Sequence, residues 1–360
     1  MRVRYPHIRV PGGFTRPTGD LGLQLSRRTD HVETWSPPYV VQRILALYAS
    51  LPVTVEVRDV VDEAGSRLSL DIWNAVYPVM AHSLADQRSY EEYCLAYVDV
   101  LAARDGDPAG SGFAGVEPGL ASRGICKALI AVLPPHRGSG TGTALYERLS
   151  SFARDRGCTE VETWVLDADP AGFQFAEKRG FVEVSREQLV ALELGEIDEP
   201  RLEPPPGVSI VTLAGRPGLE RGMYEVALEA EPDIPGFDEE IPPFEEWVQN
   251  HLRAAGDRPE ATFVALAGEE VVGFAKFHLT EARPEVARHD LTGVKRAWRG
   301  RGIARALKTA EIAWAKREGY EQLVTSNEVR NAPIVHLNEV MGYKPIPGRA
   351  LLRGPVAQAS

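Results

Sequence analysis

Two short glycine-rich segments contain the residues whose types and spacing best fit chemistry on a ligand. They cover residues 132–142 and 294–304, and each contains the pattern Arg-Gly-x-Gly. Glycine lets the backbone come close to a ligand and adopt left-handed dihedral angles. Where such a turn opens a helix, the free N–H groups and the helix dipole attract an anion. Each segment therefore predicts a phosphate-binding site.

A pyrophosphate fits a turn of this kind, and an arginine at its start adds charge-assisted hydrogen bonds. The predicted phosphate ligands are Arg137, Gly138, Ser139, Gly140, Thr141 and Gly142 in the first segment, and Arg299, Gly300, Arg301, Gly302, Ile303 and Ala304 in the second. The rival is the dinucleotide fingerprint Gly-x-Gly-x-x-Gly, which needs a third small residue where Thr143 and Arg305 stand. The strand before each turn also follows other strands instead of opening a βαβ unit.

The two segments belong to a longer internal repeat with an offset of about 162 residues. The offset holds without a gap through Gly157/Gly319, Thr163/Thr325, Glu177/Glu339, Gly180/Gly342 and Phe181/Tyr343. A repeat of this length indicates two copies of one domain and not a solenoid of small units.

Composition limits the class of protein. The 360 residues are 44% hydrophobic and 25% charged, which is typical of a soluble globular protein with two or three domains. A formal net charge of −11 argues against broad nucleic-acid binding. Three scattered cysteines predict neither a disulfide framework nor a metal site, and they suit the cytoplasm. We expect no membrane span, because no apolar run is long enough, and no secretory signal.

The order of elements repeats in the two halves and predicts an α/β fold, with helices on both faces of a sheet. Expected strands cover 53–58, 98–104, 110–116, 125–133, 160–166, 181–194, 208–213, 263–267, 271–279, 291–294 and 322–326, and a last strand starts at Gly342-Tyr343. Expected helices, besides the one after each glycine turn, cover 66–83, 89–95, 170–179, 219–230, 243–254 and 332–341.

The predicted domain organisation follows from the repeat and from a proline-rich joint. Residues 1–52 form a partly disordered arm with a candidate docking helix at 40–49. An N-terminal domain covers 53–197, and a linker rich in proline covers 198–206. The C-terminal domain covers 207–360.

Both halves resemble GCN5-related N-acetyltransferase (GNAT) domains. The acyl-CoA signature of that family is Arg/Gln-x-x-Gly-x-Gly/Ala, after a strand with a hydrophobic residue where Val132 and Val294 stand. The segment 331–343 also resembles the family's helix N-x-P/A…N-E-x-x-G-Y/F. The resemblance covers about 53–195 and 207–356, as in tandem GNAT proteins, of which the mycothiol synthases are one type.

The resemblance implies two domains, each with a mixed, mostly antiparallel sheet. It also implies direct transfer of an acetyl group from acetyl-CoA to the amine of a small molecule in a ternary complex, without a metal. A backbone N–H near Val294 or Val132 polarises the thioester carbonyl, the glycine turns hold the CoA pyrophosphate, and Asn331 contacts the pantetheine arm or phosphates. This is stabilisation of a developing oxyanion by a preorganised donor.

Two departures from the family pattern distinguish the halves. Many members have a tyrosine that protonates the leaving thiol, and the matching positions here hold Ala176 and Asn338, neither of which is an acid. Asp169 stands where the second copy has Asn331, and a carboxylate there would repel the CoA phosphates. We therefore expect catalysis in the C-terminal half, with Val294 and Asn338 at the reacting thioester.

The resemblance also suggests candidates for the base that removes a proton from the amine. Asp290, beside His289, stands just before the expected strand 291–294, and family members often use an acid there. Glu162 is the similar candidate in the first half. The alternative interpretation for Asp290 and His289 is that both are solvated hairpin residues.

Two other functions stay open at this point. Some tandem GNAT-like proteins transfer an amino acid from aminoacyl-tRNA, so tRNA is a partner only under that alternative. The other alternative is a non-catalytic acyl-CoA-binding protein. The main prediction has a small-molecule amine as partner and a monomer or homodimer as the assembly.

Overall fold

The computed structural model describes residues 54–237 and 240–358. The predicted arm at 1–52 and its candidate helix at 40–49 lie outside the described residues. The described parts of the two halves, 54–197 and 207–358, are called the N-terminal and C-terminal half below. No helix in the described residues combines the length and apolar character that crossing a membrane requires.

Each half contains strands and helices in the same order. The N-terminal half contains β1 (Val55–Asp59), α2 (Glu63–Val76), η1 (Pro78–Met80), α3 (Leu84–Tyr93), β2 (Ala96–Arg104), β3 (Asp107–Val116), α4 (Pro118–Ala121), β4 (Ile125–Val132), η2 (Pro134–His136), α5 (Thr141–Asp155), β5 (Glu160–Leu166), α6 (Pro170–Glu177), β6 (Val182–Glu193) and η3 (Leu194–Glu196). The C-terminal half contains β7 (Val208–Thr212), α7 (Glu220–Ala230), η4 (Glu231–Asp233), α8 (Phe244–Leu252), η5 (Pro259–Ala261), β8 (Thr262–Ala267), β9 (Glu270–His278), β10 (Val286–Val294), η6 (Arg296–Trp298), α9 (Ile303–Arg317), β11 (Gln322–Glu328), α10 (Ala332–Val340) and β12 (Lys344–Pro355).

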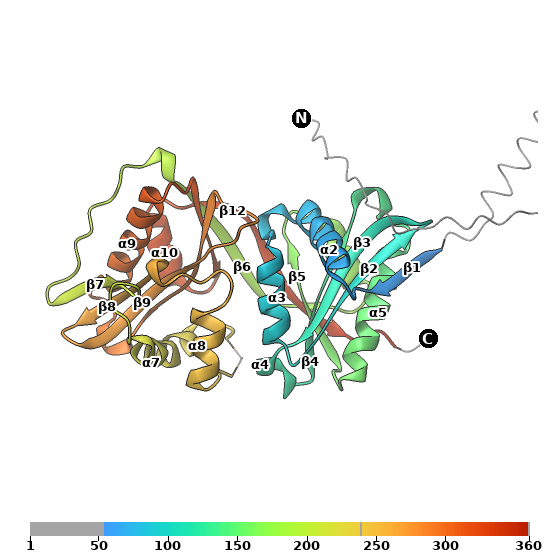
Figure 1. The fold of residues 1–360 in the computed structure, drawn as a ribbon, viewed down its shortest axis with the longest axis horizontal. Coiled ribbons are helices and arrows are strands. Elements are labelled where there is room, and N and C mark those ends of the chain that lie inside the picture. Colours follow the sequence, from blue (N-terminus) through green and yellow to red (C-terminus); the bar gives the residue numbers. More distant parts are fainter. Residues whose placement is uncertain (1–53, 238–239, 359–360) are drawn as a thin grey trace, which may run out of the picture.

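The strands of both halves form one continuous sheet in the described residues. Its order is β1-β2-β3-β4-β5-β12-β6-β11-β10-β9-β8-β7. The last strand of each half is exchanged, because β12 pairs with β5 and β6 pairs with β11, both antiparallel. Figure 1 shows β6 and β12 crossing the middle of the molecule between the two lobes. The repeat predicts a last strand in each half but not this exchange.

Helices cover both faces of the sheet, which confirms the predicted fold class. In the N-terminal half, α5 packs over Val100 and Ala114, whereas α2 packs on the opposite face over Leu101 and Leu129. In the C-terminal half, α9 covers the face of Phe263 and α7 and α8 cover the other. Neighbouring residues of a strand point to opposite faces, so each strand contributes to two cores.

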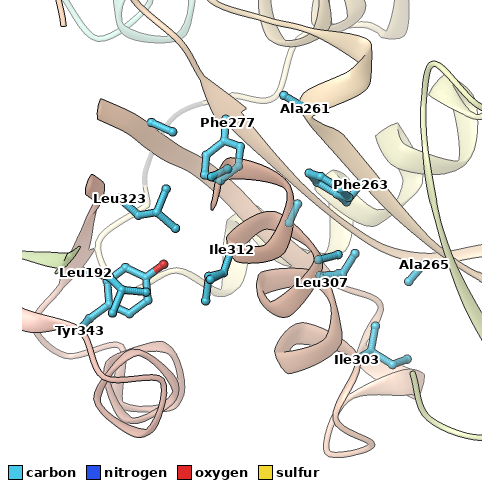
Figure 2. Packing of buried hydrophobic residues seen from close by; sticks show 14 of the residues in the cluster. Leu192, Ala261, Phe263, Ala265, Phe277, Ile303, Leu307, Ile312, Leu323 and Tyr343 are labelled. Carbon is cyan, nitrogen blue, oxygen red and sulfur yellow. The ribbon is translucent and has the colours of Figure 1, made fainter. Parts of the chain in front are cut away.

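Exchanged residues complete both cores. Leu192 of β6 lies in the hydrophobic cluster of the C-terminal half, together with Leu323 and Tyr343 (Figure 2). Leu194, in η3 just after β6, belongs to the same cluster. In return, Leu352 of β12 packs with core residues of the N-terminal half. Neither half therefore has a complete core within its own stretch of chain.

Three expected elements differ from the structure for identifiable reasons. The helix expected at 66–83 ends at Val76, because Pro78 cannot continue a helix and starts a separate short turn. The helix expected at 89–95 begins at Leu84, where Ser83 and Asp86 form a capping box. The strand expected at 291–294 begins at Val286. Its middle carries polar residues, which conceal a strand from a reading by hydrophobicity.

The exchange predicts that a residue of β12 stabilises the N-terminal half. Leu352→Ala removes a side chain that is 5% exposed, so it should lower the free energy of unfolding by about 2–4 kcal/mol. Hydrogen exchange should increase in β5 and α6. Leu202→Ala, at a 37% exposed linker residue, is the control and should change stability by less than about 0.5 kcal/mol. Faster exchange only in α9 and α10 would contradict the prediction.

Candidate active site

The two glycine turns have the same backbone geometry. Gly138 and Gly140 have φ of 72° and 91°, and Gly300 and Gly302 have φ of 72° and 85°. All four lie in the left-handed region, which disfavours residues with a side chain. Gly140 and Gly302 are the N-caps of α5 and α9, and neither helix start has a side-chain cap. The first N–H groups of both helices therefore remain available to an anion.

The arginine of each motif holds its turn in place. Arg299 Nε donates to the carbonyl oxygen of Val294 at 3.0 Å, and Arg137 Nε donates to that of Val132 at 3.2 Å. Arg299 also pairs with Asp233 at 2.6 Å. These contacts link the end of the strand to the turn, so each arginine has a structural role besides the predicted contact with phosphate.

A gap opens between the two strands that flank each turn. In the N-terminal half, residues 125–127 of β4 pair with 160–162 of β5, and the strands then diverge. In the C-terminal half, residues 286–288 of β10 pair with 322–324 of β11 before the same divergence. Beyond these points, the facing strands share no ladder hydrogen bonds in the described residues, so backbone groups there can bind a ligand. Some of these groups are already engaged, because the carbonyl oxygen of Ile130 accepts a hydrogen bond from the Tyr77 hydroxyl.

In the N-terminal half the divergence leads into a cavity of about 490 Å³. Its wall includes Val132, Arg137, Gly140, Phe175 and Ala176, so the strand end, the turn and α6 enclose one space. Cavities of this volume suit small-molecule ligands. The predicted ligand residues of the N-terminal turn therefore adjoin a cavity that accommodates part of a cofactor-sized molecule.

The strand before the turn differs between the halves. β3 and β4 pair in one register from Gly110↔Val132 to Gly115↔Lys127. β9 and β10 shift register by one residue between His289 and Thr292, which is a β-bulge. β10 thus has one residue more than β4 at this point. Bulges redirect backbone and side-chain groups, and they are common beside active sites.

Asp290 lies in this bulge and belongs to a network of charges. Its carboxylate pairs with Lys276 at 2.6 Å, and Lys276 also pairs with Asp257 at 2.6 Å. The side chains of Lys276 and Asp257 are 3% and 2% exposed, and that of Asp290 is 44% exposed. Loss of hydration acts to raise the pKa of Asp290, but Lys276 outweighs it, and the pKa lies below its usual range.

Lys276 therefore keeps Asp290 ionised. A carboxylate held in this way attracts an ammonium group and accepts a hydrogen bond from an amine. It is a weak proton acceptor, because an efficient general base has a pKa near the working pH. His251 and His278 lower the pKa of Asp290 further, and burial lowers the pKa of His251 itself. No local pattern in the sequence marks Lys276, Asp257 or His251, which other segments of the chain bring to Asp290.

His289 is not a solvated hairpin residue. It is 3% exposed, its Nε2 lies 2.5 Å from the hydroxyl of Tyr343, and its Nδ1 lies 3.0 Å from Glu311. Its side chain points toward α9, away from the face of Asp290. Burial lowers the pKa of His289 despite Glu311, so the imidazole is neutral at pH 7. Glu162, the candidate in the other half, is 3% exposed and bonded to Arg353, which gives it a structural role.

Asn338 lies on α10, and Asn331 is the residue at the start of that helix. Asn338 is 1% exposed, and neither polar atom of its amide has a hydrogen-bond partner in the described residues. Asn331 is the N-cap of α10 but makes no side-chain cap bond. Asp169, its counterpart, caps α6 through Gly172 and lies 3.7 Å from Arg137. The two asparagines therefore have bonding capacity left for a ligand, whereas Asp169 is already engaged.

A family model described as the acetyltransferase (GNAT) family matches residues 67–181 and 222–343 of the chain. The mycothiol acetyltransferases of Geodermatophilus obscurus and Nocardiopsis dassonvillei are 28% and 27% identical to it over 274 residues. These alignments cover 68% of this chain and 78% and 77% of those proteins.

Two solved structures share the fold over most of the chain. A tandem GNAT protein from the clavulanic acid biosynthesis pathway has a TM-score of 0.69 at 17% identity, covering 85% of this chain and 100% of that one. A GCN5-related N-acetyltransferase from Sphaerobacter thermophilus has a TM-score of 0.66 at 24% identity, with 86% and 98% covered.

The buried lysine predicts a large effect on stability. Lys276→Met leaves the Asp257 carboxylate buried without its cation, so the free energy of unfolding should fall by about 3–5 kcal/mol in urea titrations. Lys295→Met, which removes a lysine paired with exposed carboxylates, should cost less than about 1 kcal/mol. Equal losses in the two variants would contradict this.

The same variant should change the dependence of stability on pH. The folded-state pKa of Asp290 is lowered, so its charge stabilises the fold above the unfolded value of about 3.9, and this contribution is lost as pH falls. Without Lys276 the pKa of Asp290 should rise, and the loss of stability toward acid should become shallower.

Proposed function

The chain belongs to the acetyltransferase (GNAT) family, and on that premise we propose that this N-acetyltransferase moves the acetyl group of acetyl-CoA to the amine of a small molecule. We place the reaction in the C-terminal half, at the gap between β10 and β11. The observation that carries this placement is the bulge with its ionised carboxylate, Asp290. β4 has no bulge, and the apolar residues Ala128 and Leu129 stand where β10 has Asp290.

Several features support the donor site. The uncapped start of α9 offers N–H groups to the CoA pyrophosphate, and Gly300 and Gly302 keep side chains away from it. Asn331 has a free amide for the pantetheine arm. In the described residues β10 makes no ladder bonds to β11 beyond Arg288, and a backbone N–H near Val294 is the proposed donor to the thioester carbonyl.

In the proposed reaction, the side chains mainly supply hydrogen bonds. The amine nitrogen attacks the thioester carbon, the carbon–sulfur bond breaks, and the amine loses one proton. Asp290 accepts a hydrogen bond from the amine and orients it, and the proton passes to this carboxylate or to water. Asn338 is no acid, so its amide only donates a hydrogen bond to the sulfur, and the thiolate is protonated by solvent.

The N-terminal half has a different proposed role. Its cavity and uncapped turn suit CoA, but it has no carboxylate in β4 and no bulge. We assign it binding of CoA without turnover. The names of the two mycothiol acetyltransferases favour a small molecule as acceptor, in agreement with the proposed amine. The cytoplasm as location, and a monomer or homodimer as assembly, stay predictions from the sequence.

Matched glycine variants test the donor site. Gly302→Val should lower kcat/KM for acetyl-CoA by about 10- to 100-fold, because charge-assisted bonds to the pyrophosphate are lost. Gly140→Val should weaken CoA binding to the N-terminal half without changing turnover. Gly319→Val has a similar φ of 84° at the far end of α9, so it controls for backbone strain. CoA binding with no thiol release from any amine would instead indicate a non-catalytic acyl-CoA-binding protein.

A charge-removing variant tests the acceptor side. Asp290→Asn should lower kcat by about 100-fold, because the amine loses its charged hydrogen-bond acceptor, while KM for acetyl-CoA stays unchanged. Asp169→Asn, the control in the other half, should keep kcat within about threefold of wild type. Unchanged turnover of Asp290→Asn would remove Asp290 from the mechanism.

A further inference from the structure

A small cavity between the two halves lies beside the paired ends of β10 and β11. It has a volume of about 120 Å³, enough for a few water molecules or one charged head group but not for a whole substrate. Its wall includes Arg288, Thr280, Thr325 and Ser326 of the C-terminal half and His82 of the N-terminal half. None of the described residues that line it is an Asp or Glu.

Arg288 has no hydrogen bond or ion pair within the described residues, although the charges around it are paired. Arg349 pairs with Glu187 at 2.6 Å, and Lys276 pairs with both of its carboxylates. Burial lowers the pKa of Arg288 to about 10, with Arg349 adding to this effect, so the group is charged at pH 7. Arg288 is half-buried, and a guanidinium with reduced access to water and no partner carries a cost that an anionic ligand would offset.

The internal repeat shows what Arg288 lacks. In the N-terminal half, Lys127 of β4 lies across from Gly115 of β3. Glu117, two residues after Gly115, pairs with Lys127 at 3.0 Å. In the C-terminal half, Arg288 lies across from His278, and the residue two along is Thr280. The cation is thus present in both halves, but its carboxylate is present only in the first. The hydroxyl of Thr280 donates instead to Asp86, at 2.5 Å.

The position of Arg288 relates it to the proposed reaction. It is the last residue of β10 that pairs with β11, so it lies where the gap begins. Its neighbours His278 and Lys276 share one face of β9, and Lys276 bonds to Asp290. Arg288 and Asp290 therefore share the face opposite α9, two residues or roughly 7 Å apart along the strand.

We propose that the acceptor amine carries an anionic oxygen group, a carboxylate or a phosphate, and that Arg288 binds it in this cavity. The anion takes the place that Glu117 has beside Lys127 in the N-terminal half, and the amine reaches Asp290. Donor and acceptor then approach the gap from opposite faces of the sheet. This inference rests on the proposed function, because it names the class of acceptor for the same site.

Three variants of the full chain test the proposal in a free-thiol assay with acetyl-CoA. The first set of acceptors is β-alanine and O-phosphoethanolamine with neutral-headed ethanolamine. The second set is glucosamine 6-phosphate with glucosamine. Wild type should prefer the anionic acceptors of each set. Comparing β-alanine with the phosphates then shows whether the site favours a carboxylate or a phosphate. Arg288→Gln should raise KM for anionic acceptors by roughly 10- to 100-fold and leave KM for acetyl-CoA unchanged.

Thr280→Glu adds a carboxylate beside Arg288 and removes the bond from Thr280 to Asp86, so it should raise the same KM, with circular dichroism as the check on folding. Arg317→Gln, at an exposed pair with Glu199, is the control and should behave as wild type. Preference of the wild type for neutral-headed amines, or unchanged KM in both Arg288→Gln and Thr280→Glu, would overturn the proposal.

A binding measurement separates failure of this inference from failure of the proposed function. Phenylglyoxal labels free guanidinium groups, and mass spectrometry reports the label on Arg288. β-Alanine or O-phosphoethanolamine should slow labelling of Arg288, and ethanolamine should not. Protection without acetyl transfer would sink the proposed function but keep the anion site, whereas no protection by either anion would sink the anion site itself.

Discussion

Backbone pairing of the exchanged strands is the constraint on which the rest of this structure depends. β12 completes the sheet beside β5, and β6 completes it beside β11, so hydrogen bonds join the two repeats into one sheet. Each exchanged strand also brings core side chains, such as Leu352 and Leu192. The relative position of the repeats is set by this ladder, and so is the cavity between His82 and Arg288.

Within that common framework, one additional residue distinguishes the repeats. The bulge in β10 turns Asp290 toward Lys276, while the regular strand β4 has apolar residues in the same region. Both repeats keep the glycine turn and the diverging strands, which suit an acyl-CoA. In the C-terminal repeat, a buried lysine pairs with two carboxylates. A similar fold therefore supports binding in both halves and the proposed chemistry in one.

Much of the fold was predictable because its signals are local. Glycines with positive φ, apolar spacing on α9 and the repeat itself indicated the turns, the helices and the fold class, and the family comparison confirmed the N-acetyltransferase. Errors arose where a local signal was weak or conflicting. Polar residues concealed the start of β10, and His289 looked exposed although a partner on α9 buries it. The roles of the predicted site residues stay predictions.

The sequence by itself determined the two copies, their glycine turns and the residue types at each turn, because these depend on neighbours in the chain. Only the tertiary structure decided which strands complete each half, where the bulge lies, and which charges meet. Lys276, Asp257 and Asp290 come from three separate segments. Arg288 differs from Lys127 because it lacks a carboxylate like that of Glu117, which lies just after β3. Such contacts depend on strand register, which the pairing of distant segments fixes.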